Sequence, residues 1–176
     1  MGIIHFQTKL SQIGTRTVLR LPESASAKLP SRGIVFVEGS INAVPFTAVL
    51  EPDGAGSHWF SLTSTLRENA KVAAGDTVAV SCKPSNNWPE PPIPEDFEQS
   101  LAASPDVHAL WKDISPMARW DWIRWISATS RPETRRRRIE AACDKLKKGE
   151  RRPCCFNRTL CTDPAVSKNG VLMEPQ

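Results

Sequence analysis

The chain has 176 residues, a formal net charge of +4 and a hydrophobic content of 40%. These values are typical of a globular protein with one domain or two small ones, and they exclude a disordered chain. No apolar run approaches the roughly 18 residues of a membrane span. Residues 1–16 also lack the charged start and long apolar stretch of a signal peptide, so we expect a cytoplasmic protein.

The first half of the sequence predicts short strands separated by turns. A short helical or irregular segment is expected at 24–29, and a helix capped by Ser64 is expected to run to about residue 72. Asn42 suits the positive φ of a hairpin turn. Apolar and β-branched patterns favour strands at 6–13 and 15–21, which are one long or two short strands, from 34 up to a turn at 41–44, and at 45–50, 57–62 and 77–82. Regularly spaced short strands favour a small, closed or nearly closed β-barrel over residues 1–83.

The second half predicts helices that follow a linker. Five prolines in residues 84–94 indicate an extended connection. Ser115 before Pro116 is a typical helix start, and Ser130 to Glu133 has the form of a capping box. Helices are expected at 95–103, from 105 to about 111, from 116 to about 129, and from about 131 to 148. The fold class is therefore α+β, with a small N-terminal β-barrel followed by a short C-terminal helical bundle.

The last two predicted helices each carry one apolar stripe. In the first, the stripe consists of Trp122, Ile123, Trp125 and Ile126. In the second, it consists of Ile139, Ala142, Cys143 and Leu146. Helices this short are not stable alone, so we expect residues 95–153 to form a helical region packed on the barrel. Residues 154–176 are expected to form a partly disordered, Cys-containing basic tail that frays over 162–176.

The five cysteines, without a secretion signal, predict reduced thiols. Cys82 falls in a strand pattern and Cys143 on an apolar helix face, so both are expected in the core. Cys154 and Cys155 lie in a basic segment whose arginines would lower the pKa of a thiol, which makes them candidate reactive thiols. Neither Cys-x-x-Cys pairs nor a histidine accompany Cys161 in this segment, so we expect no metal site and no cofactor.

Positive charge is concentrated in residues 131–158, which hold eleven Lys or Arg and four Asp or Glu. One interpretation is a solvated helix face; the other is an anion-binding face for nucleic acid, phosphate or lipid headgroups. Arg135 and Arg138 precede buried positions by one turn, so each guanidinium is expected to reach a carboxylate or carbonyl. Arg136 and Arg137 are expected to point to solvent.

Two stretches of the chain resemble known bacterial families. Residues 33–42, 54–59, 66–67 and 75–78 resemble a domain of unknown function, DUF1905, built as a small double-split β-barrel. Residues 125–126, 132–135, 138–139 and Leu146 before Gly149 resemble the bacteriocin-protection, YdeI/OmpD-associated family. Together the two regions cover most of residues 5–155.

The resemblance implies this fold and a link to antimicrobial-peptide tolerance or envelope stress. Many such peptides are cationic, so a cationic face would repel them, and an anionic ligand, nucleic acid or anionic lipid is the better partner. The chain departs from the family at Thr129-Ser130, where the family has Ala-Lys, and an activity that needs this lysine is not expected here. A second departure is Ala43, where glycine usually follows Asn in a hairpin turn.

No catalytic residues are predicted, because the spacing of His58 from Asp53 and Ser57 defines no triad. Arg67 is interpreted either as a partner of Glu68 or Asp76 or as a ligand contact. The candidate ligand-binding residues are Arg67, Trp125, Arg135, Arg138 and His58. Two hypotheses follow: a non-enzymatic binding or stress-response module that uses the arginine face, or a small-ligand binder or enzyme that uses a groove between barrel and helices.

Overall fold

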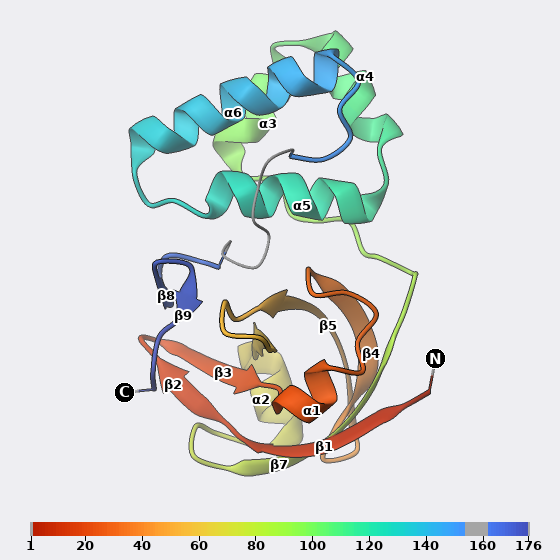
Figure 1. The fold of residues 1–176 in the computed structure, drawn as a ribbon, viewed down its shortest axis with the longest axis vertical. Coiled ribbons are helices and arrows are strands. Elements are labelled where there is room, and N and C mark those ends of the chain that lie inside the picture. Colours follow the sequence, from red (N-terminus) through yellow and green to blue (C-terminus); the bar gives the residue numbers. More distant parts are fainter. Residues whose placement is uncertain (1, 154–161, 176) are drawn as a thin grey trace. The chain divides into compact units, whose positions relative to one another are not determined.

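The computed structural model describes residues 2–153 and 162–175, which fall into two compact units (Figure 1). Among the described residues, the N-terminal unit combines residues 2–87 with residues 162–175, and the helical unit spans 88–153. Each unit has its own hydrophobic core. In the described part of the chain, none of the helices is long and apolar enough to cross a membrane. The candidate thiols Cys154 and Cys155, and Cys161, lie outside the described residues.

The N-terminal unit is built on one curled antiparallel sheet. Its strands are β1 (Ile4–Lys9), β2 (Ser11–Ile13), β3 (Arg16–Arg20), β4 (Val35–Ile41), β5 (Val44–Pro52), β6 (His58–Ser61) and β7 (Thr77–Pro84). Their order is β1-β7-β4-β5-β6-β3-β2. Only Leu10 separates β1 from β2, yet the two strands occupy opposite edges of the sheet. The sheet therefore curls until its edges approach one another at this bend, and the small N-terminal β-barrel expected from the sequence takes the form of a half-barrel.

Strand alternation fills the interior of the half-barrel. In β7, Val78, Val80 and Cys82 are buried while the residues between them face outward. The turn between β4 and β5 places Asn42 at φ 47° and Ala43 at φ 68°. The hairpin expected at Asn42 is thus confirmed, and Ala43 holds a left-handed conformation that glycine would adopt more freely.

Two short helices complete this part of the chain, α1 (Glu23–Ser26) and α2 (Ser64–Ala70). The cap of α2 is Thr63 rather than the expected Ser64, because the Thr63 side chain accepts a hydrogen bond from the Leu66 amide at 3.2 Å.

The end of the chain is ordered, so the expectation that residues 162–176 fray is wrong for 162–175. β8 (Ser167–Lys168) and β9 (Val171–Leu172) form a hairpin with Asn169 and Gly170 at its turn. The physical reason is burial: Val166 and Leu172 cover Trp59 in a second small core.

Backbone contacts fix this hairpin on the sheet. The Leu172 amide donates to the Asp53 carbonyl at 2.8 Å, and the Thr162 hydroxyl donates to the Pro52 carbonyl at 3.0 Å. Gly54 has φ 77°, and a Cβ there would collide with the carbonyl oxygen of Gly170. A glycine at position 54 is therefore what allows the hairpin to approach this closely.

The helical unit contains α3 (Glu95–Ala102), α4 (Pro105–Asp113), α5 (Pro116–Ser127) and α6 (Pro132–Lys147). The predicted cap of α5 is confirmed, since the Ser115 hydroxyl accepts from the Ala118 amide at 3.2 Å. The predicted capping box at Ser130 is wrong: the cap of α6 is Arg131. Pro132 takes the first helical position and keeps the residue before it extended, which prevents an earlier start.

Both predicted apolar stripes face the core of this unit. Trp122, Ile126 and Leu146 are almost completely buried, and Ala142 is also inside. Trp125 is only half-buried. Trp125 is therefore more exposed than the core residues, although its ring packs edge-on against that of Trp122, with ring centroids 5.9 Å apart.

Candidate functional site

Arg135 joins α6 to α3 through a two-pronged ion pair. Its Nε and Nη2 donate to the two carboxylate oxygens of Asp96 at 2.5 and 3.0 Å. These hydrogen bonds lower the pKa of Asp96 below its usual value and raise the pKa of Arg135. The arginine side chain is 26% exposed, so this pair lies at the edge of the unit.

Arg138 joins α6 to the end of α5. Its Nη1 donates to the carbonyl oxygen of Trp125 at 2.6 Å, and its guanidinium carbon lies 5.6 Å from the centre of the Trp125 ring. A cation near the end of a helix satisfies carbonyls that have no partner within the helix, and its position over the ring adds a cation–π attraction. Arg138 and Trp125 are thus brought together, primarily as a contact between two helices.

The neighbouring arginines face water. Arg136 is exposed, and Arg137 pairs with Glu133 one turn earlier at 2.7 Å, with more than two thirds of each side chain exposed. The predicted division of the four arginines is confirmed in its geometry. Arg135 and Arg138 reach a carboxylate and a carbonyl, whereas Arg136 and Arg137 remain at the surface.

α5 carries three buried charged residues that were not predicted from the sequence, Arg119, Asp121 and Arg124. Arg119, which is 10% exposed at its side chain, pairs with Glu90 at 2.5 Å and also donates to three carbonyl oxygens at the end of α4. Asp121 is fully buried, with one oxygen 3.7 Å from Nε of Arg152. Arg124 is buried as well. These three charged residues lie on different sides of a tryptophan-rich helix, so the helix has no continuous polar face. That pattern could have indicated that some of the charges are buried.

His58 is part of the interior of the N-terminal unit. It is 1% exposed, its Nε2 lies 2.8 Å from the Gly33 carbonyl oxygen, and its Nδ1 lies 2.7 Å from the Ser26 hydroxyl. A carbonyl only accepts, so Nε2 must donate to it. Arg32 donates to the Ser26 hydroxyl at 3.2 Å, which leaves that hydroxyl to donate to Nδ1. This network holds the loop before β4 against β6.

Arg67 lies half-buried on α2 in the same unit. Its Nε is buried without a hydrogen-bond partner in the described part of the chain. Among the described residues no ion pair joins Arg67 to Glu68 or Asp76, and a carboxylate oxygen of Asp76 accepts from the Ala73 amide at 2.8 Å. The five candidate residues are therefore divided, with His58 and Arg67 in the N-terminal unit and Trp125, Arg135 and Arg138 in the helical unit.

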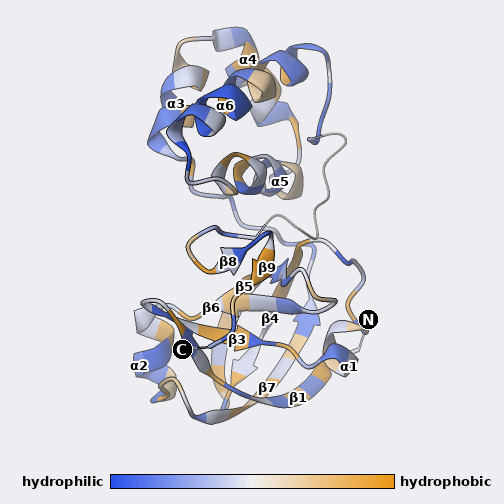
Figure 2. Cartoon of the chain, turned by 60° about the vertical axis from the view of Figure 1, so that its left-hand side comes forward, coloured by the Kyte–Doolittle hydropathy of each residue, from blue (hydrophilic) through white to orange (hydrophobic). Residues whose placement is uncertain are grey.

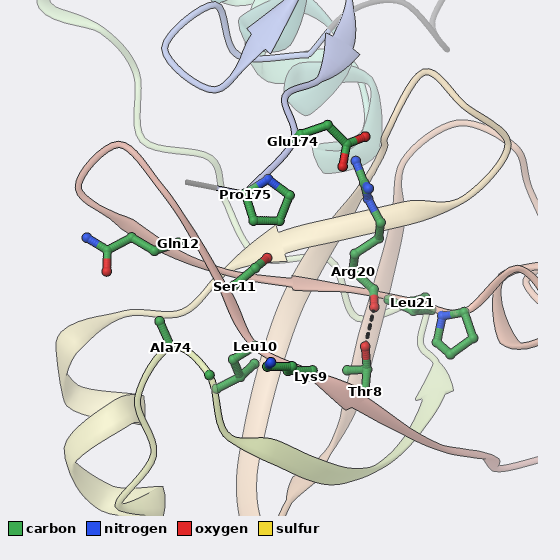
Figure 3. A pocket seen from close by; sticks show the side chains of 12 residues that line it. Thr8, Lys9, Leu10, Ser11, Gln12, Arg20, Leu21, Ala74, Glu174 and Pro175 are labelled. Carbon is green, nitrogen blue, oxygen red and sulfur yellow. Dashed lines mark hydrogen bonds between the residues drawn. The ribbon is translucent and has the colours of Figure 1, made fainter.

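The N-terminal unit also contains a groove of about 680 Å³ (Figure 3). It is lined by residues 8–12, 20–22, 74–75 and 174–175. Two cations line it, Arg20 of β3 and Lys9 of β1. Residues 2–153 and 162–175 contain no cluster of three or more His, Cys, Asp or Glu side chains arranged to hold a metal ion.

Comparison with protein families agrees with this architecture. The curled half-barrel followed by several helices defines a two-part α+β protein. Residues 6–82 match the family model of a domain of unknown function, DUF1905, and residues 90–149 match that of the family described as Bacteriocin-protection, YdeI or OmpD-Associated. The chain carries these two family regions in this order, which confirms the resemblance. No curated protein matches the chain.

Proposed function

We propose that this protein is a non-enzymatic binding module for stress response in the cytoplasm, and that exposed cations of α6 bind nucleic acid. The observation that carries the proposal is the uneven charge of the helical unit. Residues 131–152 hold ten Lys or Arg and four Asp or Glu. Residues 88–130 hold three Lys or Arg and seven Asp or Glu. Positive charge gathered on one segment attracts polyanions at long range.

Only some of these cations are available to a partner. Arg135, Arg137 and Lys145 pair with carboxylates of the same unit. Exposed cations outside the ion pairs found among the described residues are Arg131, Arg136, Lys147 and Lys148. They form one group at each end of α6, which is drawn largely in the blue of hydrophilic residues in Figure 2.

The spacing of these cations favours an extended partner. Arg136 and Lys147 are separated by about 16 Å along the helix, at a rise of about 1.5 Å per residue. Glu140 and Asp144 lie between them on the same side of α6, so the positive field is strongest at the two ends. A single phosphate cannot contact both ends, whereas a nucleic-acid backbone presents charges at both.

An anionic lipid surface is the weaker alternative. Helices that bind at membrane surfaces use large apolar side chains to enter the headgroup layer. Among the described residues, the exposed large hydrophobic side chain is that of Ile3, in the N-terminal unit. The cationic face of α6 therefore lacks an apolar anchor.

A binding role is also supported by the state of three chemically active side chains among the described residues, His58, Cys82 and Cys143. Both ring nitrogens of His58 are engaged in the interior. Burial raises the pKa of Cys82 to about 11 and also raises that of Cys143, so neither thiol is activated as a nucleophile. Both cysteines are free thiols, in keeping with the cytoplasmic location that forms part of the proposal.

Fluorescence anisotropy with a labelled 20-nucleotide strand and its duplex tests this function. The full chain should bind at 50 mM salt and lose affinity steeply at 200 mM. Replacement of four exposed cations of α6 by Gln should weaken binding at least about tenfold and reduce the salt dependence; these are Arg131, Arg136, Lys147 and Lys148. The matched control removes four exposed lysines of the N-terminal unit, Lys28, Lys71, Lys83 and Lys168.

The control should retain most of the affinity. Equal losses in the two quadruple variants, or no binding at 50 mM salt, would reject the proposed role of α6. Phosphatidylserine vesicles provide a further arm. Binding to vesicles but not to nucleic acid would replace the proposed partner by a lipid surface.

A second candidate function is the binding of a small ligand. The groove in the N-terminal unit favours it, because about 680 Å³ lies within the range of typical ligand cavities, about 300–1,000 Å³. This groove is formed within the N-terminal unit alone.

A further inference from the structure

The groove lies where the curled sheet fails to close. β1 pairs with β7, and β3 pairs with β2 and β6, so β1 and β3 approach without forming a strand pair. Their link is a side-chain contact, in which the Thr8 hydroxyl donates to the Arg20 carbonyl at 2.9 Å (Figure 3). The opening beside this contact is bounded by the β1–β2 bend and by the end of β3.

The lining of the groove combines apolar surface with a few polar groups. Leu10 and Leu21 are buried beneath it, and Pro22 and Pro175 add apolar surface at its sides. The polar groups include the cations of Lys9 and Arg20 and the hydroxyl of Ser11. Such a composition is typical of a site for a small organic molecule with one charged end.

Arg20 has hydrogen-bonding capacity to spare. Its Nε lies 3.4 Å from an Asp53 carboxylate oxygen, and its Nη2 donates to the Leu172 carbonyl at 3.5 Å. The other Asp53 oxygen accepts from the amides of Ala55 and Ser57, so the carboxylate is shared with its own loop. A guanidinium has five donors in a planar fork that matches a carboxylate. The Arg20 Nε is buried beside Asp53, so the donors left for a ligand are those of the two terminal nitrogens that the Leu172 contact does not use.

The chain itself already directs a carboxylate towards this arginine. In Figure 3 the side chain of Glu174 turns towards the Arg20 guanidinium at the rim of the groove. Glu174 follows β9, which is held by the bond from the Leu172 amide to the Asp53 carbonyl and by that from the Met173 amide to the Val166 carbonyl. The position of Glu174 is therefore set by the C-terminal hairpin.

We propose that this groove binds a small organic carboxylate. The ligand carboxylate pairs with the Arg20 guanidinium, and its apolar body lies against Leu21 and Pro22. Glu174 competes for the same guanidinium and lowers the affinity. This inference deepens the second candidate function and is independent of nucleic-acid binding by α6.

The test observes the arginine directly, by NMR of the Nε–H signals of the full chain. The probes are hexanoate, benzoate and N-acetylleucine, each compared with its carboxamide, and inorganic phosphate. Carboxylates should shift the Arg20 signal at least about tenfold more effectively than their amides, since a charge-assisted two-pronged pair is lost in the amide. Equal effects of carboxylate and amide, or no shift with any carboxylate, would overturn the proposal, and a response to phosphate alone would replace the ligand class.

Two variants sharpen the test. Glu174→Gln should raise carboxylate affinity about fivefold, because a competing like charge is removed, whereas the exposed control Glu68→Gln on α2 should leave it unchanged. Arg20→Lys keeps the charge but loses the fork, and should reduce affinity about tenfold.

A circular dichroism spectrum will verify that the Arg20→Lys variant is folded. If it is not, the Glu174→Gln result and the wild-type Arg20 signal decide the question, and unchanged affinity in Glu174→Gln contradicts competition. The quadruple variant of α6 should bind carboxylates normally, so failure of nucleic-acid binding and failure of this site are distinguishable.

Discussion

The two units of this protein bury different kinds of polar residue. In the N-terminal unit, Asp53 is the charged member of a set that otherwise consists of Thr17, Ser26, Ser57, His58 and Thr162. In the helical unit the buried polar residues are Arg119, Asp121 and Arg124, all of them charged. This contrast holds for the described part of the chain and follows from what each architecture leaves available for hydrogen bonding.

In the N-terminal unit, loops supply backbone donors and acceptors within reach of short side chains. The Ser57 hydroxyl donates to the Leu21 carbonyl at 2.6 Å, and the Asp53 carboxylate accepts from the amide of Ser57 at 2.9 Å. Helices use their own backbone groups except at their ends. A polar side chain between helices must therefore reach an end, which favours long arginines such as Arg119.

The largest expected effect comes from Arg119→Ala. The substitution leaves three carbonyls at the end of α4 without their donor and removes the partner of Glu90. We expect a loss of about 4 kcal/mol, because each buried carbonyl left without its donor costs about 1–3 kcal/mol. Urea unfolding followed by tryptophan fluorescence measures it, because five of the six tryptophans lie in residues 88–125.

Glu90→Gln is the control for this substitution. The Glu90 side chain is 67% exposed, so its loss should cost less than about 1 kcal/mol. A similar loss in both variants would show that the ion pair, rather than the contacts to carbonyls, stabilises the unit.

His58→Ala tests the contribution of the buried, mostly uncharged polar residues of the N-terminal unit. It removes hydrogen bonds to Ser26 and Gly33 and leaves a cavity in the interior, for an expected loss of about 3 kcal/mol. His5→Ala is the control, since His5 is exposed and bonds to Ser81 at the surface, and it should change stability by less than about 0.5 kcal/mol. Thermal unfolding followed by circular dichroism compares them; equal changes would mean that the His58 network is not structural.

Local features of the fold could be predicted from the sequence because they depend on neighbouring residues. The hairpin at Asn42 and the cap at Ser115 follow from the preferences of single residues for φ or for a free amide. The orientation of Arg135 and Arg138 follows from their position one turn before buried residues. Near Ser130 the sequence offers two signals for a helix start, the Ser-x-x-Glu pattern and Pro132. Pro132 keeps Arg131 extended, so α6 begins at Pro132 and not earlier.

Features that join distant parts of the chain could not be predicted in the same way. The partner of Arg135 is Asp96, 39 residues away, and the hairpin at 166–172 is stable because it covers Trp59. The groove arises from the meeting of the two sheet edges, so neither Arg20 nor Glu174 stood out in the sequence. His58 followed a glycine-rich loop, and its burial became apparent only from the packing around it.

The pair between Arg135 and Asp96 should make a pH-dependent contribution of about 1 kcal/mol. The pKa of Asp96 is lower in the folded state than the value of about 3.9 expected when unfolded. Its contribution is therefore present above about pH 4 and is lost as the pH falls through the folded-state pKa. Asp96→Asn should thus be less stable at pH 7, and its difference from the wild type should shrink as the pH falls below about 4, as measured by urea unfolding.

Glu98→Gln separates the pair from the helix dipole. Glu98 shares the first turn of α3 with Asp96, so it reports the general benefit of an acid at a helix start. A loss at pH 7 as large as that in Asp96→Asn would mean that the dipole, and not Arg135, stabilises this turn.

The smallest effects are expected from lysine substitutions in the arginine run. Arg138→Lys loses the combined contact with the Trp125 carbonyl and ring, and Arg135→Lys loses the two-pronged pair, so each should cost about 1 kcal/mol. Arg136→Lys and Arg137→Lys should change stability by less than about 0.3 kcal/mol, because an exposed lysine can replace an arginine in a helical pair. Melting temperatures of the four variants test this order, and four equal shifts would identify the run as a solvated face.

All four substitutions preserve charge, so the long-range electrostatic attraction of nucleic acid should be unchanged. The nucleic-acid affinity of Arg136→Lys should therefore remain close to that of the wild type. A large loss of affinity in Arg136→Lys would indicate recognition by the guanidinium fork.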